Sequence, residues 1–392
     1  MNSDLQVRPA RSRPGAVDFF CGVGGMSLGL AAAGFDLLGA VDHDERVVRA
    51  YNANFGDGHA VTADLAACTI SELRASLNLP ETIDLVAGGP PCQGFSLMGS
   101  RVEDDDRNLL LYRFAELAVQ LKPRAVLIEN VPGALMGDHI KWLSSALGIL
   151  ADGGYRIHGP RIIDAASLGV PQRRRRLFVV ATRSDVHTFS FPRATHVLLA
   201  SENGGSLPLA PSASEAIGDI PDLAAIDALY SRDTHELPLS EDCGGYTRLL
   251  RSSDFFGVAP ASPQRNRVMS GLKLSRHSEA VRERFEHTPP GDTEQVSHFH
   301  RLHPDEPANT IRAGTGPERG SYMAPRPIHY REPRCITVRE AARLQSFPDW
   351  FQFHPTNWHG FRQVGNAVPP LVAKALGDAC RQSLEEDDQA HT

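Results

Sequence analysis

The 392-residue sequence has few cysteines, and none of the six stands in a Cys-x-x-Cys pair. This argues against a disulfide framework and against a zinc knuckle, so no structural metal is expected. The sequence also lacks an apolar run long enough to cross a bilayer, and no apolar stretch follows the basic N-terminus as it would in a secretory signal. We therefore expect a cytoplasmic protein without membrane contact.

An excess of positive charge is missing from the chain as a whole, because 40 basic and 47 acidic side chains give a net charge of -7. The balance reverses in one part only: residues 251–343 hold 15 basic and 11 acidic side chains. A polyanion binds where basic side chains are concentrated. We expect nucleic acid, if it is a partner, to touch this stretch.

The length exceeds what one hydrophobic core usually organises, which predicts two domains. From Ala16 to Arg183 short apolar runs alternate with amphipathic stretches, a pattern typical of an α/β domain with a mainly parallel sheet. Strands are expected at residues 16–20, 37–42, 60–63, 84–87, 125–129, 161–164 and 177–181. Helices are expected at 26–33, 108–121, 337–344 and 369–384, the last ending in a frayed, solvated acidic tail at 385–388. Between 183 and 336 the composition predicts a loop-rich second domain.

Glycines follow the first expected strand in the sequence Asp-Phe-Phe-Cys-Gly-Val-Gly-Gly at residues 18–25. They let the backbone turn tightly and approach a ligand at the start of the next helix. A dinucleotide fingerprint would have glycine where this chain has Ser27, so a nicotinamide enzyme is disfavoured. Asp42 and Asp64, at the ends of the next two strands, suit a ribose diol and an adenine amino group, although each could equally cap a helix. An adenosyl ligand fits all three strand ends.

Cys92 lies in the sequence Gly-Gly-Pro-Pro-Cys-Gln-Gly-Phe-Ser at residues 88–96, directly after the fourth expected strand. Two glycines permit close backbone approach and two prolines fix φ, so the thiol is expected at the carboxyl edge of the sheet, where doubly wound folds bind ligands. A lone cysteine is most often an inert buried side chain. The rigid context nevertheless favours a nucleophile.

Two further charged motifs accompany expected strands. Glu129 ends an apolar strand, where partial burial would raise its pKa and keep a proton available; a surface glutamate that caps a helix is the alternative. The sequence Pro-Gln-Arg-Arg-Arg-Arg begins at Pro171, and period-two geometry places Gln172, Arg174 and Arg176 on one face. On an open surface this run would be a solvated basic patch, whereas facing a cleft it would hold phosphate and the polar edge of a base.

In order and spacing these motifs resemble those of the DNA (cytosine-5)-methyltransferases of the prokaryotic modification type. The matching segments lie at residues 20–25, 91–93, 129–131, 172–176, 339–349 and 365–370, and they cover most of the chain outside 186–335. The resemblance implies a Rossmann-like S-adenosylmethionine-dependent methyltransferase fold with a smaller, loop-rich target-recognition domain. It places the catalytic domain at 1–185, completed by 355–392, and the target-recognition domain at 186–354.

The resemblance also implies roles for individual residues. S-adenosylmethionine is expected to contact Phe20, Gly22, Gly24, Asp42, His43, Asp64, Pro90 and Asn366. The expected catalytic residues are Cys92, Glu129, Arg174 and Arg176. Contacts to double-stranded DNA are expected from Gln93, Ser96, Gln172, Thr310, Arg312 and Arg319. His43 stands where the family often has an aromatic or aliphatic residue.

The implied reaction begins with a cytosine that is flipped out of duplex DNA. The Cys92 thiolate attacks C6 of the base while Glu129 donates a proton to N3, so that C5 becomes nucleophilic and accepts the methyl group. Loss of the C5 proton then expels the cysteine. A monomer is expected, in a restriction-modification context with a cognate endonuclease that acts on the same site.

Three alternatives remain distinguishable. A tRNA cytosine-5 methyltransferase would carry a Cys-Phe-Thr tripeptide, which this sequence lacks. A zinc-dependent cytosine deaminase would need a Pro-Cys-x-x-Cys motif, but Phe95 follows at that spacing. A catalytically silent DNA-binding module would have lost one of Cys92, Glu129 or Arg176.

Overall fold

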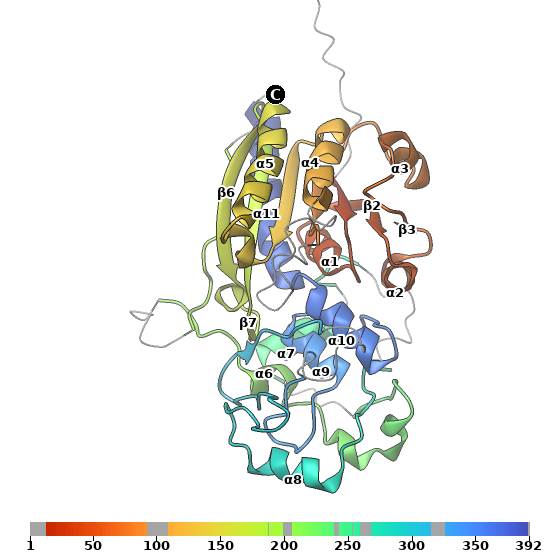
Figure 1. The fold of residues 1–392 in the computed structure, drawn as a ribbon, viewed down its shortest axis with the longest axis vertical. Helices are drawn as coiled ribbons and strands as arrows, with labels where there is room; N and C mark the ends of the chain where they lie inside the picture. Colours follow the sequence, from red (N-terminus) through yellow and green to blue (C-terminus); the bar gives the residue numbers. More distant parts are fainter. Residues whose placement is uncertain are drawn as a thin grey trace, which may run out of the picture.

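The structure is a computed structural model that describes residues 13–91, 109–186, 188–198, 206–238, 243–252, 254–258, 268–314 and 326–390. A seven-stranded sheet flanked by helices stands above a second lobe that is mostly loops and short helices (Figure 1). The strands of the sheet are β1 (Gly15–Phe19), β2 (Asp36–Asp42), β3 (Ala60–Thr62), β4 (Leu85–Gly88), β5 (Ala125–Asn130), β6 (Tyr155–Asp164) and β8 (Arg175–Arg183).

The strand order is β3-β2-β1-β4-β5-β8-β6. The first five strands pair in parallel, and β8 pairs antiparallel with both of its neighbours, β5 and β6. The order reverses beside β1, which makes the crevice outside the carboxyl ends of β1 and β4 the usual ligand site of such a sheet. The mainly parallel sheet and the Rossmann-like α/β class expected from the sequence are confirmed.

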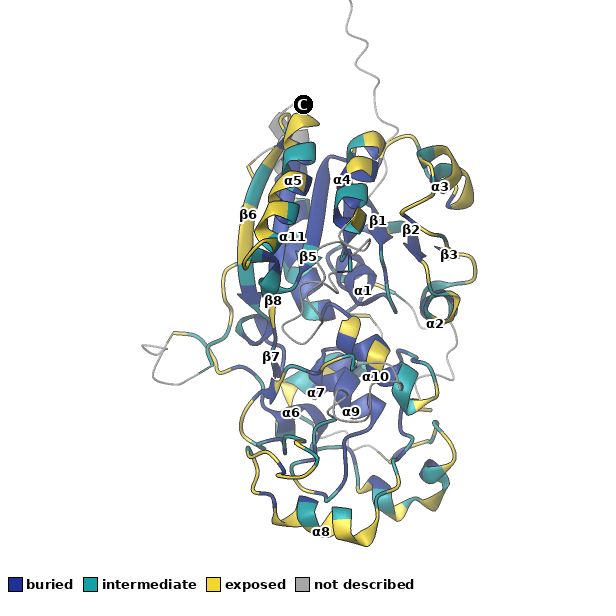
Figure 2. Cartoon of the chain, in the orientation of Figure 1, coloured by how far each residue is buried: buried dark blue, intermediate teal, exposed yellow. Residues whose placement is uncertain are grey.

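Helices cover both faces of the sheet. One face packs on α1 (Gly25–Ala32) and α11 (Pro370–Ala390), and the other on α3 (Ile70–Ser76), α4 (Leu109–Leu121) and α5 (His139–Asp152). Alternate residues of β4 serve the two faces, because Leu85 and Ala87 share a core with α1 and α11 while Val86 shares one with α4 and α5. The central strands of the sheet are buried on both faces (Figure 2), and for this reason their sequences are almost entirely apolar. No helix among the described residues is long and apolar enough to span a membrane.

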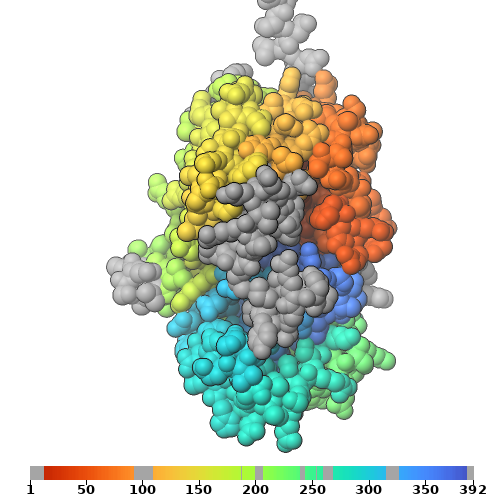
Figure 3. All heavy atoms as spheres, viewed as in Figure 1, coloured from red at the N-terminus to blue at the C-terminus, as the bar shows by residue number. Residues whose placement is uncertain are grey.

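The second lobe has its own core, formed largely by apolar residues between 213 and 367. Its helices are α6 (Ala213–Ile217), α7 (Gly245–Arg251), α8 (Glu279–His287), α9 (Val338–Leu344) and α10 (Asn357–Asn366). A two-stranded parallel ladder of β7 (Gln172–Arg173) and β9 (Ala308–Asn309) connects it to the sheet. Short 3-10 helices lie at Pro132–Leu135, Ala165–Leu168, Leu223–Ala225 and Asp227–Tyr230. In the space-filling view, C-terminal residues (blue) lie between the N-terminal part (red) and the second lobe (green to cyan) (Figure 3).

The core of the second lobe is organised by buried arginines as well as by apolar side chains. Arg343 is fully buried and forms ion pairs with Asp219 and Asp349. Arg339, also fully buried, donates to the carbonyls of Pro348 and Phe351. The apolar residues of α10 belong to this core, whereas those of α11 pack on the sheet. The domain boundary near residue 355 stays a prediction.

Two expectations about element ends were wrong. The acidic residues 385–388 do not form a frayed tail after a helix that stops at 384, because α11 continues through Ala390. Glutamate is a good helix former, and an ion pair between Arg381 and Glu385 adds support one turn apart. Strand β6 begins at Tyr155, six residues before the expected start, because β8 pairs with it along its whole length.

The capping box expected at Thr337 is confirmed, since its hydroxyl accepts from the Glu340 amide and the Glu340 carboxylate accepts from the Thr337 amide. Glu340 also accepts two hydrogen bonds from Arg334, at 2.9 and 2.7 Å. Burial opposes ionisation of this carboxyl, but the Arg334 charge and hydrogen bonds prevail and lower the pKa of Glu340 to about 2. Its ion pair therefore stabilises the fold above the ordinary pKa near 4.5, and that contribution is lost as the pH falls toward 2.

We predict that Glu340→Gln lowers the free energy of unfolding by about 3 kcal/mol at pH 7, the lower end of the range for a broken buried pair, because the buried Arg334 loses Glu340 but keeps its ion pair with Glu332. Urea unfolding followed by circular dichroism measures the change, which should shrink at pH 3. Glu72→Gln is the matched control, since Glu72 holds the same place in the Thr69 capping box of α3 but is exposed. Equal losses in the two variants would contradict the prediction.

Candidate active site

The turn after β1 is shaped by residues in left-handed backbone conformations. Phe20, Gly22 and Gly24 have φ angles of 58°, 54° and 100°. A Cβ on Gly24 would lie 2.4 Å from the Phe55 ring, so only glycine fits there. A Cβ on Gly22 would meet nothing within 4 Å. The space beside the Gly22 backbone is therefore open, and its contact with a ligand stays a prediction.

Asp42 anchors this turn from the end of β2. One carboxylate oxygen accepts from the Gly22 amide at 3.0 Å and the other from the Asp44 amide at 3.0 Å. The imidazole Nδ1 of His43 lies 3.2 Å from the same carboxylate, and this hydrogen bond raises the pKa of His43. The His43 side chain is 77% exposed, so it stands at the rim of the strand edge. Asp64 is exposed, and its side chain accepts from the Ala66 amide at 2.9 Å.

A buried polar network beneath the turn was missed by the sequence analysis. The Asp18 carboxylate accepts from the amide and the hydroxyl of Ser27, at 3.1 and 2.6 Å, and the Tyr51 hydroxyl donates to the Ser27 hydroxyl at 2.9 Å. Burial raises the pKa of Asp18 to about 7 against the effect of these hydrogen bonds. Ser27, which stands where a dinucleotide-binding fingerprint would have glycine, thus links Asp18 of β1 to the first turn of α1.

Glu129 and Arg176 form an ion pair at the carboxyl end of β5, with Arg176 Nε 3.0 Å from Glu129 Oε1. Their side chains are only 13% and 16% exposed. Burial raises the pKa of Glu129 above its ordinary value, although the charges of Arg176 and Arg174 oppose the rise. The carboxyl group is therefore biased toward its protonated form while remaining hydrogen-bonded in place.

The chain that leads to Cys92 runs beside this pair. In the parallel register Gly88 of β4 is opposite Ile128 of β5, and a Cβ on Gly89 would lie 3.1 Å from Glu129 Oε2. Pro90 and Pro91 are the last described residues before a gap. Cys92, Gln93 and Ser96 lie outside the described residues, and so does Arg319.

The arginine run separates into two environments. Gln172 and Arg174 are fully buried, whereas Arg173 is half-buried and Arg175 is exposed. The guanidinium of Arg174 donates to three protein carbonyls, those of Ile311 (3.0 Å), Gly365 (2.7 Å) and Ala367 (3.0 Å). The contacts of Arg174 are thus made within the protein, and Arg176 alone of the run contacts Glu129.

Three further predicted site residues, Thr310, Arg312 and Asn366, lie near Arg174. Thr310 donates through its hydroxyl to the Arg173 carbonyl at 2.7 Å, and Arg312 follows two residues later. Asn366 is the last residue of α10 and is exposed, between the two carbonyls that Arg174 holds. The structure thus brings Thr310, Arg174 and the Asn366 turn together.

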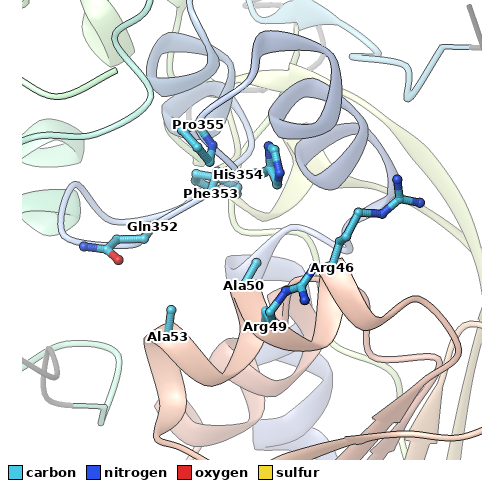
Figure 4. A pocket seen from close by; sticks show the side chains of 8 residues that line it. All are labelled: Arg46, Arg49, Ala50, Ala53, Gln352, Phe353, His354 and Pro355. Carbon is cyan, nitrogen blue, oxygen red and sulfur yellow. The ribbon is translucent and has the colours of Figure 1, made fainter. Parts of the chain in front are cut away.

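A cavity of about 200 Å³ lies between α2 (Glu45–Phe55) and residues 352–355 (Figure 4). None of the predicted site residues lines it, and its basic residues Arg46 and Arg49 are paired with Asp44 and Glu45. Beside it, the Asn54 amide exchanges two hydrogen bonds with the backbone of Gln352. The cavity is a gap at the contact between α2 and the second lobe. No cluster of three or more potential metal ligands occurs in the described parts of the chain.

Comparison with known proteins places this arrangement in a family. The family model for C-5 cytosine-specific DNA methylase matches residues 15–382. The type II methyltransferase M.XorII of Xanthomonas oryzae pv. oryzae is 40% identical over 96% of this chain and 86% of its own length. The type II methyltransferase M.AgeI of Thalassovita gelatinovora is 29% identical over 94% and 99%.

Solved structures agree with this assignment. A crystal structure whose description names a DNA modification methyltransferase encoded within an E. coli prophage superposes with a TM-score of 0.78 and 32% identity, and it covers 95% of this chain and 99% of that one. The Dnmt2 methyltransferase of S. pombe, with a TM-score of 0.53 and 17% identity, shares the fold. With its Glu-Arg pair and glycine turn at the edge of a Rossmann-like sheet, the chain belongs to the C-5 cytosine-specific DNA methylase family and is a DNA (cytosine-5)-methyltransferase of the type II restriction-modification kind.

Proposed function

We propose that this enzyme methylates C5 of a cytosine flipped out of duplex DNA, through a covalent bond between Cys92 and C6 of the base. The Glu129–Arg176 pair carries the proposal: a buried carboxyl group with a raised pKa lies beside Gly89, three residues before the cysteine. A proton donor and a nucleophile on neighbouring strand ends are what activation of C5 requires.

The residues at the strand edge fit S-adenosylmethionine. Gly22 leaves open space for close approach, and the Asp42 carboxylate, one atom of which already orders Gly22, retains lone pairs for a ribose diol. His43 and Asp64 stand at the rim for the adenine, and the exposed Asn366 amide suits the polar methionine end. When bound, the cofactor supplies the methyl group as an electrophile.

The protein's own residues prepare the base. The Cys92 thiolate adds to C6, the C5–C6 electrons form a C4–C5 double bond, and the C4–N3 electrons pass to N3, where Glu129 donates a proton; the enamine so formed is nucleophilic at C5. Arg176 orients Glu129 and faces the base. After methylation, a solvent base takes the proton from C5, its electrons restore the C5–C6 double bond and expel the Cys92 thiolate, and the N3 proton returns to Glu129.

DNA contacts must recover the few kcal/mol that base flipping costs. We assign this task to the target-recognition region at 186–354, with its basic stretch and Thr310, whereas the DNA contact expected of Gln172 is not proposed again, because Gln172 is fully buried and its amide is bonded to Ile311 and Gln345. The chain acts as a soluble monomer beside a cognate endonuclease of the same site specificity. Bisulfite sequencing of DNA from a host that expresses the protein tests the function. Modified cytosines in one sequence context are expected; methylation of tRNA in place of DNA would support the alternative branch.

Replacement of the nucleophile should stop turnover. Cys92→Ser should lose nearly all activity, because a hydroxyl is scarcely ionised near neutral pH whereas a free thiol is ionised to a few per cent. A duplex with 5-fluorocytosine at the target should trap the wild type covalently, since fluorine does not leave as a proton. Cys243→Ser, outside the site, is the matched control. Absence of an adduct with active wild-type enzyme would refute the assignment.

Loss of the general acid should slow chemistry and leave cofactor binding intact. Glu129→Gln keeps size and hydrogen bonding but removes the transferable proton, so the single-turnover rate should fall roughly 10²-fold or more. Because the acid acts in its protonated form, the wild-type contribution should decline as the pH rises above the raised pKa of Glu129. Glu116→Gln, at an exposed position of α4, is the control. Weakened cofactor affinity with an unchanged rate would move Glu129 to the cofactor site.

Specificity should depend on the glycine-rich stretch that begins at Arg312. Arg312→Ala and Arg319→Ala should each relax discrimination at one base pair by about 1–3 kcal/mol, the range for a bidentate base contact. Methylation of every single-base variant of the recognised site measures this. Unchanged preference in both variants would remove the stretch from base readout and direct attention to residues 292–300.

A further inference from the structure

The turn that carries Asn366 is held by side chains from two distant parts of the chain. Arg174, between β7 and β8, donates to the carbonyls on both sides of Asn366. Gln345, which follows α9 in the second lobe, donates through Nε2 to the Ala367 carbonyl at 2.6 Å. Its neighbour Ser346 accepts from the Leu371 amide at 3.2 Å, at the start of α11. The position of Asn366 is thus set by residues outside its own helix.

Arg174 also contacts the segment that leads to Arg312, and there it acts together with Gln172. Gln172 Oε1 accepts from the Ile311 amide at 3.0 Å, and Arg174 Nη1 donates to the Ile311 carbonyl at 3.0 Å. Gln172 Nε2 also donates to Gln345 Oε1, which connects the contacts at Ile311 to the contact between Gln345 and the Ala367 carbonyl. The two ends of this network are therefore the segment around Ile311 and the turn that carries Asn366.

Direct backbone contact reinforces the connection. A Cβ on Gly365 would lie 2.4 Å from the Ala313 amide nitrogen and 2.5 Å from the carbonyl carbon of Arg312, so the two segments touch without an intervening side chain. Gln172, Arg174 and Gln345 are at most 1% exposed. A shift of one segment alone would leave buried donors or acceptors without partners, which is costly away from water.

We propose that Gln172, Arg174 and Gln345 form a clamp that couples DNA binding at residues 310–314 to cofactor binding at Asn366. They act as positioning residues, since their bonds run to protein groups. The inference rests on the proposed function, which places DNA and cofactor at the two ends. Coupling of this kind is reciprocal: the factor by which DNA tightens cofactor binding equals the factor by which cofactor tightens DNA binding.

The test measures that factor in both directions. The affinity for S-adenosylhomocysteine is determined by calorimetry with and without a duplex that contains the methylated site, and the affinity for the duplex with and without S-adenosylhomocysteine. We expect about 5-fold or more in the wild type, the lower end of typical coupling. Gln345→Met keeps the volume but breaks the bonds to Gln172 and Ala367, so the factor should approach one. Gln172→Met should act likewise from the other end.

Asn54→Leu is the matched control, because Asn54 also joins the two lobes through a buried amide but does so by way of Gln352. It should retain the wild-type factor. An unchanged factor in both glutamine variants would overturn the clamp, and so would an equal fall in Asn54→Leu. Methyl transfer by the wild type is assayed in parallel: an inactive wild type contradicts the proposed function, whereas an active one with coupling unaffected by the glutamine variants contradicts the clamp alone.

Discussion

The parallel register of β1, β4 and β5 is the constraint on which the active site depends. Phe19, the last residue of β1, is opposite Gly88, the last residue of β4, and Gly88 is opposite Ile128, two residues before β5 ends at Asn130. Apart from Asp18, the residues inside these strands are apolar or glycine and are buried, so the glycine turn and Glu129 lie at or near the strand ends. Gly88 keeps this register, since a Cβ there would lie 2.6 Å from the Phe114 ring and 2.7 Å from the Phe19 carbonyl. The glycine turn and residues 89–91 therefore leave the sheet from neighbouring strands, and Gly89 lies beside Glu129 near the end of β5.

The second lobe meets a different constraint, because it has little sheet to supply backbone partners. Buried arginines replace that function: Arg343 joins α6, through the Ala216 carbonyl, to Asp349 beyond α9. A buried ion pair costs desolvation energy and contributes little net stability, but a buried charge without a partner is strongly unfavourable. Such pairs therefore favour one arrangement of irregular segments over others. If the second lobe is the target-recognition domain, as we propose, its loops need this fixed geometry for their side chains to read bases.

The sequence predicted the sheet and the strand-end residues because both depend on local pattern. An apolar run that ends in Glu129 is visible in one dimension, and so is the Thr337 capping box. Asp18 was not identified, since an acid inside an apolar strand has meaning only through Ser27, nine residues later, and Tyr51. The partners of Arg174 are 137 to 193 residues away, so no local pattern reveals them. What escaped sequence analysis is long-range polar contact.

Arg174 and Arg176 show how two identical side chains in one motif come to do different work. Arg174 distributes its donors over three carbonyls, a task that needs the guanidinium fork and that a lysine could not perform. Arg176 instead faces Glu129, where its charge opposes the effect of burial on the pKa of the carboxyl group. A base that enters the site removes water from Glu129 and adds to desolvation, which shifts the carboxyl further toward its protonated form. In the proposed mechanism, binding of the base thus prepares Glu129 for the step in which N3 accepts a proton.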